Sequence, residues 1–351
     1  MKAAKLFGPR DMRIVDVPEP RAPGVGEALI LVGAVGVCGS DLHTYEDGRI
    51  GDTVVRDPLV LGHEFAGTVV AVGDRDARNG LGEPLLPGQR VAVEPGLPCW
   101  HCDRCEQGHP NLCRHLGFMG LWPDDGALQE RLVVPARNCF PLPDTLSMDA
   151  GALLEPLGVA LHAIDLAKLR LAQPVAVLGC GPIGLLIMRL AKLAGAGTLF
   201  ALDQFGWRLD AARRWGADET IDITAGDPVE QLRERTGGRG VPTVIEAAWA
   251  GDAVRQAVEM ADLGGRVVLV GIPGDDSAYF KHSSARRKGL SLIMSRRMKH
   301  TYPRATRLAT SGAFDLDQLV THRFPLEQAG AAHALNAAYE DGVIKVMVTV
   351  S

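Results

Sequence analysis

The feature that most constrains this chain is a cluster of four cysteines within fifteen residues: Cys99, Cys102, Cys105 and Cys113. Their spacing, C-x2-C-x2-C-x7-C, lets one short loop fold around a single tetrahedral zinc ion through four thiolates. Two disulfides are the alternative, but the start MKAAKLFGPRDMRIVDV lacks the apolar segment of a secretory leader. In a reducing compartment, clustered cysteines indicate metal binding. Because the protein fills all four positions of this predicted structural site, we expect the chemistry to occur elsewhere.

The composition is that of an ordinary globular protein without a strong charge. The 351 residues are enough for two domains, 46% of them are hydrophobic, and the formal net charge is -5. This charge gives no electrostatic reason to expect nucleic acid or an anionic membrane as a partner. The apolar run VAVLGCGPIGLL is broken by glycine and proline, so no membrane span is expected. We expect a cytoplasmic protein that acts on a small molecule.

The pattern of apolar segments divides the chain into two parts. The first part has short β segments between glycines and prolines, predicted at 28–32, 67–72, 90–93 and 131–134. From about residue 155, strands alternate with helices, which predicts a doubly wound parallel sheet in an α/β fold. Its six predicted strands are 175–178, 198–202, 220–223, 243–247, 266–270 and 290–294.

Helices are predicted at 183–193 and 252–263 in this second part, the latter closed by Gly264 and Gly265. A last helix over 325–339 and a strand over 345–350 are expected to return to the first part of the fold. The predicted domains are 1–154 with 295–351, including a zinc lobe over 95–115, and a Rossmann domain over 155–294.

A glycine-rich turn after the first strand of the second part predicts a dinucleotide site. Gly179, Gly181 and Gly184 follow the strand and open an apolar-periodic helix, the context that a G-x-G-x-x-G motif requires. The first glycine permits a tight turn, the second a close approach to a pyrophosphate, and the third close helix packing. The start of this helix, with Pro182 and Ile183, presents free N–H groups to the phosphates.

Asp203 ends the next strand, nineteen residues after Gly184. A carboxylate there accepts hydrogen bonds from the ribose hydroxyls and repels a 2′-phosphate, which favours NAD over NADP. Arg208 is expected near the adenine end, where it is also a possible partner of a 2′-phosphate. Val270 and Gly271, after the fifth strand of this part, are further predicted cofactor-binding residues.

A second, open metal site is predicted from residues scattered along the chain. Cys38 and His63 are each, taken alone, more often core residues than ligands. Together with Glu64 and Glu155 they form a thiolate, imidazole and carboxylate set that leaves room for a water or substrate oxygen. Glu155 stands among apolar residues in LLEPLG, and a buried carboxylate needs a metal, a cation or a proton.

These motifs together resemble the zinc-dependent medium-chain dehydrogenases, most closely the sorbitol (polyol) branch. The similarity runs nearly end to end through CGSDLH at 38–43, EDGRIGD at 46–52, LGHEFAGTVVAVG at 61–73, LLEPLGVALHA at 153–163, GCGPIG at 179–184 and VTHRFPLEQA at 320–329. The resemblance implies a GroES-like catalytic domain plus a Rossmann domain, and a homotetramer or homodimer.

The resemblance also implies roles for individual residues. Cys38 and His63 match catalytic zinc ligands. Glu64 and Glu155 match two glutamates whose roles at the catalytic zinc vary within the family. Ser40 matches the hydroxyl that takes the substrate proton, and His43 the next relay group. Arg297 matches a substrate-binding arginine, and Thr44 stands where a tyrosine is common in polyol enzymes. The implied cofactors are two zinc ions per chain and NAD.

The implied reaction is hydride transfer from a secondary alcohol of a polyol or sugar-like substrate to NAD, giving a ketone. An L-threonine 3-dehydrogenase-like enzyme is a close alternative. Two further alternatives, a zinc-free quinone reductase and a non-enzymatic crystallin, are disfavoured, because neither would need the set of Cys, His and Glu ligands. A basic stretch over 281–307 has nine Lys or Arg and no acid. It indicates either a solvated face or, through Arg296, Arg297 or Lys299, binding of a phosphorylated or acidic sugar derivative.

Overall fold

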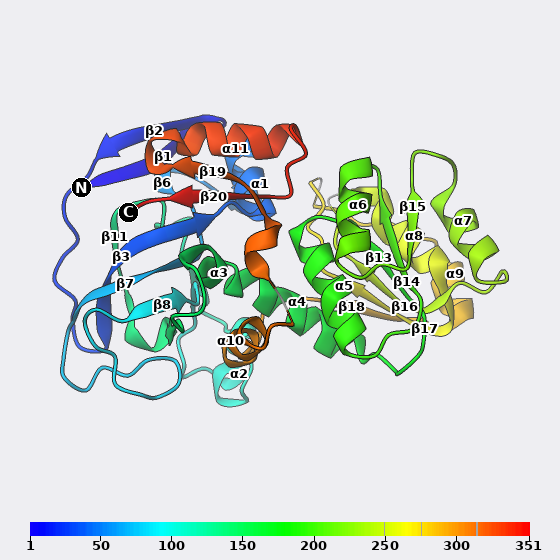
Figure 1. The fold of residues 1–351 in the computed structure, drawn as a ribbon, viewed down its shortest axis with the longest axis horizontal. Helices are drawn as coiled ribbons and strands as arrows, with labels where there is room; N and C mark the ends of the chain where they lie inside the picture. The colour runs from blue at the N-terminus through cyan, green and yellow to red at the C-terminus, as the bar shows by residue number, and fades with distance from the viewer. Residues whose placement is uncertain (249, 275, 314) are drawn as a thin grey trace. The chain divides into compact units, whose positions relative to one another are not determined.

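The computed structural model describes residues 1–248, 250–274, 276–313 and 315–351. The chain forms two compact units (Figure 1). The first unit consists of Met1–Gly158 and Lys299–Ser351, and the second of Val159–Met298. Helix α4 (Leu154–Ala167) carries the chain from the first unit into the second. Each unit is described separately below.

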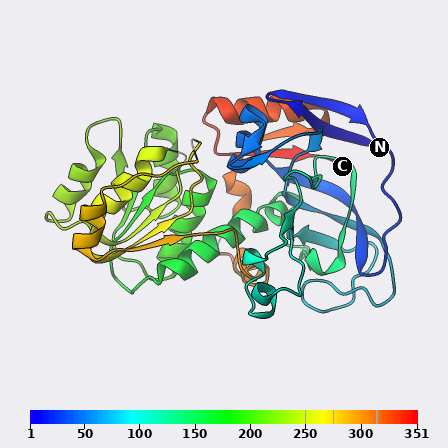
Figure 2. The ribbon, with the colours of Figure 1, turned by 180° about the vertical axis from the view of Figure 1, so that it is seen from behind.

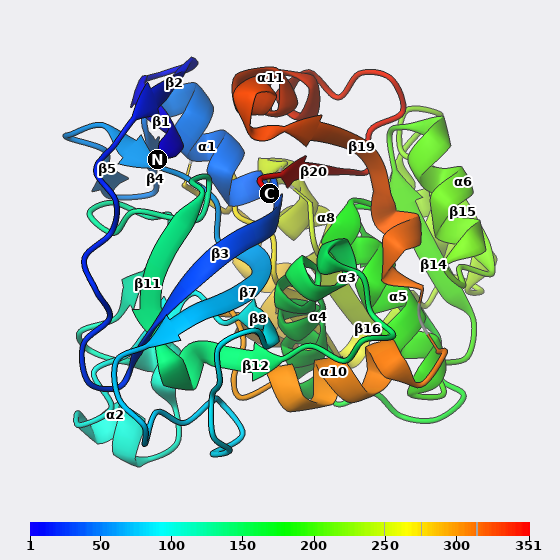
Figure 3. The same ribbon diagram turned by 60° about the vertical axis from the view of Figure 1, so that its left-hand side comes forward.

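A seven-stranded sheet forms the centre of the first unit. The strand order is β12-β8-β7-β3-β20-β19, and β11 also pairs with β3. The strands are β3 (Glu27–Gly36), β7 (Glu64–Val72), β8 (Arg90–Val93), β11 (Arg131–Pro135), β12 (Cys139–Pro141), β19 (Val320–Pro325) and β20 (Lys345–Thr349). Figure 3 shows β11, β3, β7 and β8 lying side by side. Pairing of β3 with β7 sets Gly36 opposite Glu64.

The end of the chain completes this sheet. Strand β20 pairs with β3, with Met347 opposite Gly36. Helix α11 (Ala329–Ala338) packs against α1 (Gly39–Asp47) and β2 (Asp11–Asp16), as Figures 1 and 2 show in red and blue. Residues from the N-terminal and C-terminal segments of the chain therefore come together around the end of β3.

Shorter elements complete the first unit. Strand β1 pairs with β2 on one side and with β6 on the other. Strand β9 pairs with β10, and β4 pairs with β5. The remaining elements are β1 (Lys2–Gly8), β4 (Arg49–Ile50), β5 (Thr53–Val54), β6 (Leu59–Val60), β9 (Gly96–Leu97), β10 (Gly117–Phe118), α2 (Asp103–Glu106), α3 (Met148–Ala152), α10 (Tyr302–Thr310), η1 (Pro110–Leu112), η2 (Ala136–Asn138), η3 (Leu316–Leu319) and η4 (Leu326–Gln328).

The second unit is a six-stranded parallel sheet in the order β15-β14-β13-β16-β17-β18. The strands are β13 (Val175–Leu178), β14 (Leu199–Asp203), β15 (Glu219–Asp222), β16 (Val241–Glu246), β17 (Ala261–Leu269) and β18 (Ser291–Met294). Every residue of β13 is buried, as expected for a central parallel strand. The strand order reverses between β13 and β16, so ligands are expected at the carboxyl ends of these two strands.

Helices cover both faces of this sheet (Figure 1). One face carries α5 (Pro182–Leu193) and α6 (Gly206–Arg214), and the other carries α7 (Pro228–Arg235), α8 (Gly251–Met260) and α9 (His282–Lys288). The prediction of a helix over 252–263 is wrong at its end. Helix α8 stops at Met260, and Ala261 already pairs with Val241 as the first residue of β17. Short apolar runs fit a helix and a strand equally well, and here sheet pairing decides.

Among the described residues, one helical segment has the length and apolar composition of a membrane span, Met148–Ala167. Of its most apolar window, 78% is buried inside the structure. Leu153, Leu154 and Leu157 are each 0% exposed. The segment is therefore a core helix, and its apolar side chains are covered by protein.

Candidate active site

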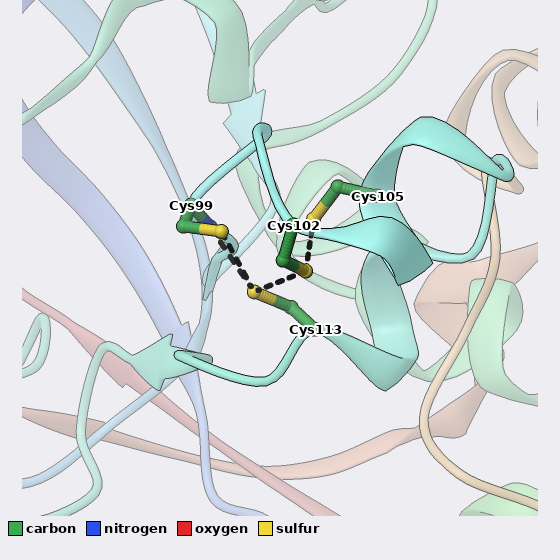
Figure 4. A group of neighbouring side chains, drawn as sticks. All are labelled: Cys99, Cys102, Cys105 and Cys113. Atoms are coloured by element: carbon green, nitrogen blue, oxygen red, sulfur yellow. Dashed lines mark hydrogen bonds between the residues drawn. The ribbon is translucent and has the colours of Figure 1, made fainter.

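The four cysteines of the lobe point their sulfurs toward one common centre (Figure 4). The Sγ–Sγ distances are 3.6 Å from Cys102 to Cys105, 3.9 Å from Cys102 to Cys113, and 3.5 Å from Cys113 to Cys99. A disulfide needs about 2.05 Å, so these are not disulfides. A tetrahedron with Zn–S bonds of about 2.3 Å has S–S edges of about 3.8 Å. The set therefore fits a closed structural zinc site.

The backbone of the lobe also supports the thiolates. The backbone N–H groups of Cys99 and His115 donate to the Sγ of Cys113, at 3.2 Å and 3.3 Å. Hydrogen bonds from the backbone N–H groups of Arg114 and Cys105 lower the pKa of Cys102 to about 6. The lobe's only helical elements are α2, of four residues, and η1, of three, within the part of the chain that the structure describes. Such short elements do not hold a loop by themselves.

A second group of metal-ligating side chains forms beside the end of β3. Cys38 is the N-cap residue of α1, and Glu64 begins β7 directly after His63. Their ligand atoms all lie within 4.8 Å of one another. Glu155 is not part of this three-residue group, although it is buried in the same unit at 5% exposure. One thiolate, one imidazole and one carboxylate are a donor set that zinc accepts while an open position remains.

Asp41 fixes the orientation of His63. Its Oδ1 lies 3.1 Å from Nδ1 of His63, and its Oδ2 accepts a hydrogen bond from the backbone N–H of Cys38 at 3.0 Å. In the neutral imidazole, a proton held on Nδ1 by this carboxylate leaves the lone pair of Nε2 for a metal. Asp41 is 2% exposed, so water does not compete for the contact. One carboxylate thus positions two of the three ligands.

The electrostatics of this pair agree with its geometry. Burial alone lowers the pKa of His63, but the negative charges of Asp41 and Cys38 raise it well above its usual value. Burial likewise raises the pKa of Asp41, and contact with His63 brings it below its usual value. Each group therefore favours the charged form of the other.

Glu64 is paired with a buried lysine. Lys345, at 2% exposure, forms an ion pair with Oε2 of Glu64 and donates to the carbonyl of Val37 at 2.9 Å. Burial lowers the pKa of Lys345, but the carboxylate of Glu64 raises it above its usual value. Gly36 leaves space for the pair, because a Cβ there would lie 2.2 Å from Oε2 of Glu64. The second metal group is therefore neutralised in part by the protein itself.

An aromatic ring packs against His63, and a buried tyrosine lies within electrostatic range of Glu64. The ring of Phe118 lies 5.2 Å from that of His63, centroid to centroid. The hydroxyl of Tyr302 donates to the carbonyl of Val93 at 2.9 Å. Burial raises the pKa of Tyr302 well above its usual value, and the carboxylates of Glu155, Glu94 and Glu64 raise it further. Burial also raises the pKa of Glu94 to about 7.

The predicted proton-transfer residues lie on α1. The Oγ of Ser40 is 3.4 Å from Nε2 of His63, at the metal-facing edge of the ring. His43 is 4% exposed and lies one turn further along the helix. Thr44, predicted to contact substrate, is 2% exposed, and its hydroxyl donates to the carbonyl of Ser40 at 3.3 Å. Of these three side chains, Ser40 is in direct contact with the metal-ligand group.

In the second unit, the glycine-rich turn has the shape that its sequence predicts. Gly179 has a φ of 92°, which only glycine adopts readily. A Cβ on Gly184 would lie 1.9 Å from the carbonyl oxygen of Gly179. Helix α5 begins at Pro182 with Gly181 as its N-cap, so its first N–H groups face the turn.

Asp203 and Arg208 lie at this turn. Oδ2 of Asp203 accepts a hydrogen bond from the backbone N–H of Cys180 at 2.8 Å, and Oδ1 accepts from Phe205 at 3.0 Å. The guanidinium of Arg208 lies over the ring of Phe205, and its Nη1 would be 3.8 Å from a Cβ on Gly181. A carboxylate and a guanidinium thus both flank the predicted phosphate and ribose positions. Val270 and Gly271 follow β17 at the same edge of the sheet.

Comparison with known proteins gives two family matches. Residues 24–144 match the alcohol dehydrogenase GroES-like domain, and residues 182–311 match the zinc-binding dehydrogenase domain. A sorbitol dehydrogenase from Bacillus subtilis is 36% identical over 348 residues, covering 99% of this chain and 97% of that protein. The chain belongs to the zinc-binding medium-chain alcohol dehydrogenase family.

Solved structures of this family agree with the fold. A zinc-binding dehydrogenase from Sinorhizobium meliloti bound to NADP aligns with a TM-score of 0.89 at 32% identity, covering 99% of this chain and 98% of that one. Galactitol-1-phosphate dehydrogenase from Escherichia coli aligns with a TM-score of 0.88 at 28% identity, covering 99% and 100%. The predicted GroES-like and Rossmann architecture is confirmed. The protein is an NAD(P)-dependent zinc alcohol dehydrogenase that acts on CH–OH groups.

The basic stretch over 281–307 is not one surface. Nζ of Lys288 donates to the carbonyls of Val258, Glu259 and Ala261, at 3.0, 2.8 and 3.0 Å. Nζ of Lys299 lies 2.9 Å from Nδ1 of His109 in the first unit. Arg297 belongs to the second unit and has a left-handed backbone with a φ of 55°. At least two of these cations therefore bind within the protein.

Several residues in or near the metal centre were not predicted from the sequence: Asp41, Glu94, Phe118, Tyr302 and Lys345. Asp41 lies inside the motif CGSDLH, so its position three residues after Cys38 was the available signal. An aspartate at the N3 position of a helix commonly bonds back to the N-cap. The others come from distant segments and carry no local pattern.

Proposed function

We propose that this enzyme oxidises a secondary alcohol of a polyol or sugar-like substrate with NAD, giving the ketone. The observation that carries the proposal is the group Cys38, His63 and Glu64 with Ser40 at its edge, in a chain that also holds a nucleotide-binding turn. The polyol class is supported by the 36% identity to a sorbitol dehydrogenase. It is also supported by Glu155, since the alcohol dehydrogenase branch has a cysteine at that place.

The chain's own residues prepare the alcohol for reaction. Cys38 and His63 would hold the catalytic zinc, with Glu64, Glu155 or a water completing its shell. When bound, zinc acts as a Lewis acid that lowers the pKa of an alcohol, which is otherwise far above neutrality. Asp41 contacts Nδ1 of His63 and thereby orients Nε2 toward the position of the metal. Ser40 accepts the substrate proton at Oγ and passes it toward His43 and solvent.

The glycine-rich turn and Asp203 would hold the cofactor. NAD held there would supply the hydride acceptor for the reaction, and these residues would align it with the substrate. A carboxylate at Asp203 favours the free ribose hydroxyls of NAD over the 2′-phosphate of NADP. Arg208 is the residue that would accept a 2′-phosphate if this preference were removed. A structural zinc in the cysteine lobe would bring the metal content to two per chain.

Asp203→Ser tests the cofactor preference. Removing the carboxylate removes its repulsion of a 2′-phosphate, so the ratio of kcat/KM for NAD to that for NADP should fall by about tenfold or more. Asp210→Ser, on the exposed side of α6, is the matched control and should leave the ratio unchanged. An unchanged ratio in Asp203→Ser would contradict the NAD assignment.

The substrate class is tested with a panel of alcohols and NAD, followed at the NADH absorbance. The panel contains neutral polyols, L-threonine, sugar phosphates and sugar acids. The proposal predicts the highest kcat/KM on a neutral polyol. A second candidate, a phosphorylated or acidic sugar, is supported by the positive charges of Arg296 and Arg297 in the basic stretch over 281–307. Higher activity on the anionic compounds would favour that candidate.

We further propose that the enzyme works as a homotetramer or homodimer in the cytoplasm, by analogy with its family. Light scattering on the purified chain at micromolar concentration measures the mass directly. A single monomeric species of 37.4 kDa would contradict the proposed assembly.

A further inference from the structure

A buried glutamate that has no cationic partner among the described residues lies at the carboxyl edge of the second unit's sheet. Glu246 is the last residue of β16 and is 2% exposed. In the sheet it pairs with Leu178 of β13 on one side and Leu269 of β17 on the other. This position is the point where the strand order reverses, which is where doubly wound sheets bind their ligands.

Glu246 binds the chain segments that follow both β16 and β17. Its Oε1 accepts a hydrogen bond from the backbone N–H of Ala248 at 2.7 Å, and its Oε2 accepts from Gly271 at 3.2 Å. Its main-chain carbonyl accepts from Val270 at 2.8 Å. One residue therefore joins segment 247–248 to segment 270–271.

Segment 247–248 packs directly on the glycine-rich turn, and segment 270–271 packs against segment 247–248. The backbone N–H of Ala247 donates to the carbonyl of Leu178 at 2.8 Å, and a Cβ on Gly179 would lie 2.6 Å from the carbonyl oxygen of Ala247. A Cβ on Gly271 would lie 2.1 Å from the carbonyl oxygen of Ala248 and 2.4 Å from Oε1 of Glu246. Neither glycine has space for a methyl group, so the backbone segments are in close contact. A shift of either segment would therefore displace the glycine-rich turn.

In the part of the chain that the structure describes, backbone N–H groups stabilise the charge of Glu246. Burial raises its pKa to about 7, and the N–H groups of Ala248 and Gly271 reduce that rise. No charged side chain is among the causes of this shift in the described residues. A buried carboxylate is costly unless its oxygens are satisfied. Its presence here calls for a role other than stability.

We propose that Glu246 is a positioning residue for the cofactor, whose ionised carboxylate holds segments 247–248 and 270–271 in the shape that the nicotinamide half of NAD requires. The proposal rests on the proposed nucleotide site. The adenosine half lies with Asp203 at the end of β14, on the other side of β13. Glu246 therefore affects the half of the dinucleotide that carries the reacting atom.

The sign of the pH dependence follows from hydrogen bonding. Above pH of about 7 the carboxylate is ionised and both N–H groups have an acceptor. Below it, one carboxyl oxygen carries a proton and accepts less well, so one of these N–H groups has a weaker side-chain acceptor, although that of Gly271 also donates to the main-chain carbonyl of Glu246 at 3.2 Å. NADH affinity is therefore expected to fall as the pH is lowered through 7.

Stability changes in the opposite direction. Because the folded state binds this proton more tightly than the unfolded state, whose pKa is near 4.5, the contribution of Glu246 to stability falls as pH rises from about 4.5 to 7. In Glu246→Gln this pH-dependent loss of stability is absent, because glutamine does not ionise. At pH 8, Glu246→Gln is thus expected to unfold at or above the wild-type temperature while binding NADH less well.

The experiment is a fluorescence titration of the full zinc-loaded enzyme with NADH at pH 6 and pH 8. For Glu246→Gln, we expect the Kd at pH 8 to rise about tenfold, from the loss of one acceptor. Its Kd should not change between the two pH values, whereas the wild-type Kd should be larger at pH 6. Affinity for AMP, which probes the adenosine half, should be unchanged.

Glu259→Gln is the matched control, because Glu259 lies in the last turn of α8, before β17 begins, and pairs with Arg233 and Lys288. It should lower the unfolding temperature without changing NADH affinity. Wild-type affinity in Glu246→Gln at both pH values, or a loss of AMP and NADH binding together with a lower unfolding temperature, would overturn the inference. Failure of the wild-type enzyme to bind NADH would instead contradict the proposed function.

Discussion

The two metal groups of this enzyme differ in how the protein builds them. The lobe draws its four thiolates from fifteen consecutive residues and adds backbone N–H donors. The group at Cys38 draws its ligands from the start of α1 and from the residues at the start of β7. It is supported by the buried side chains of Asp41 and Lys345. A closed site needs only its ligands, whereas an open site also needs residues that hold those ligands in place.

This difference predicts opposite consequences for the loss of one ligand. In the lobe, the metal replaces the packing that α2 and η1 are too short to provide. At Cys38, the sheet of β3, β7 and β20 holds the ligands whether or not a metal is bound. Loss of a ligand in the lobe should therefore lower the stability of the protein, whereas loss of a ligand at the open site should lower the turnover.

Cys38→Ser should have the largest effect on catalysis. The loss of a Lewis acid that contributes several kcal/mol corresponds to about a thousandfold decrease in kcat or more. NADH binding should remain, because the nucleotide residues belong to the second unit. Steady-state kinetics and a fluorescence titration measure both. Cys139→Ser, which removes a buried thiol outside both metal groups, is the control. Wild-type turnover in Cys38→Ser would sink the assignment of the active site.

Cys102→Ser should have the largest effect on stability. Metal binding to a structural site contributes directly to folding free energy, so we expect a lower unfolding temperature, measured by circular dichroism. The loss should be larger than that caused by Cys38→Ser. A variant that keeps the wild-type unfolding temperature would show that the lobe does not need its metal.

Asp41→Asn should have a smaller effect, because it changes only the support of a ligand. Changes to such supporting residues typically cost 10–100-fold in metal affinity or activity. Zinc affinity is measured by competition with a chelator. Asp47→Asn, at the exposed end of the same helix, is the control and should leave zinc affinity unchanged. Equal zinc affinities in Asp41→Asn and Asp47→Asn would contradict a role of Asp41 in supporting the zinc ligands.

The sequence carried most information where the chemistry is local. The cysteine spacing and the glycine-rich turn each lie within one short segment, so residue types and intervals predicted them. Asp41 was visible in the motif, but its contact with His63 depends on how α1 meets β7. Lys345 could not be predicted, because it lies 308 residues from Val37, whose carbonyl it binds. Sheet pairing between β3 and β20 brings these residues together.

The error at the end of α8 has a similar cause. Ala261, Asp262 and Leu263 continue a helical pattern and precede two glycines, which is typical of a helix C-terminus. The structure instead places them in β17, because Ala261 pairs with Val241. Local pattern determined the element types here, and long-range pairing determined where one element ended.

The most direct test of the central claim is the zinc content of the wild type and of Cys38→Ser, measured by elemental analysis. The account predicts two zinc ions per wild-type chain. It predicts one in Cys38→Ser, with no turnover and an unfolding temperature near that of the wild type. Two zinc ions retained in Cys38→Ser, or a single zinc in an active wild-type enzyme, would contradict the division into a closed structural site and an open catalytic one.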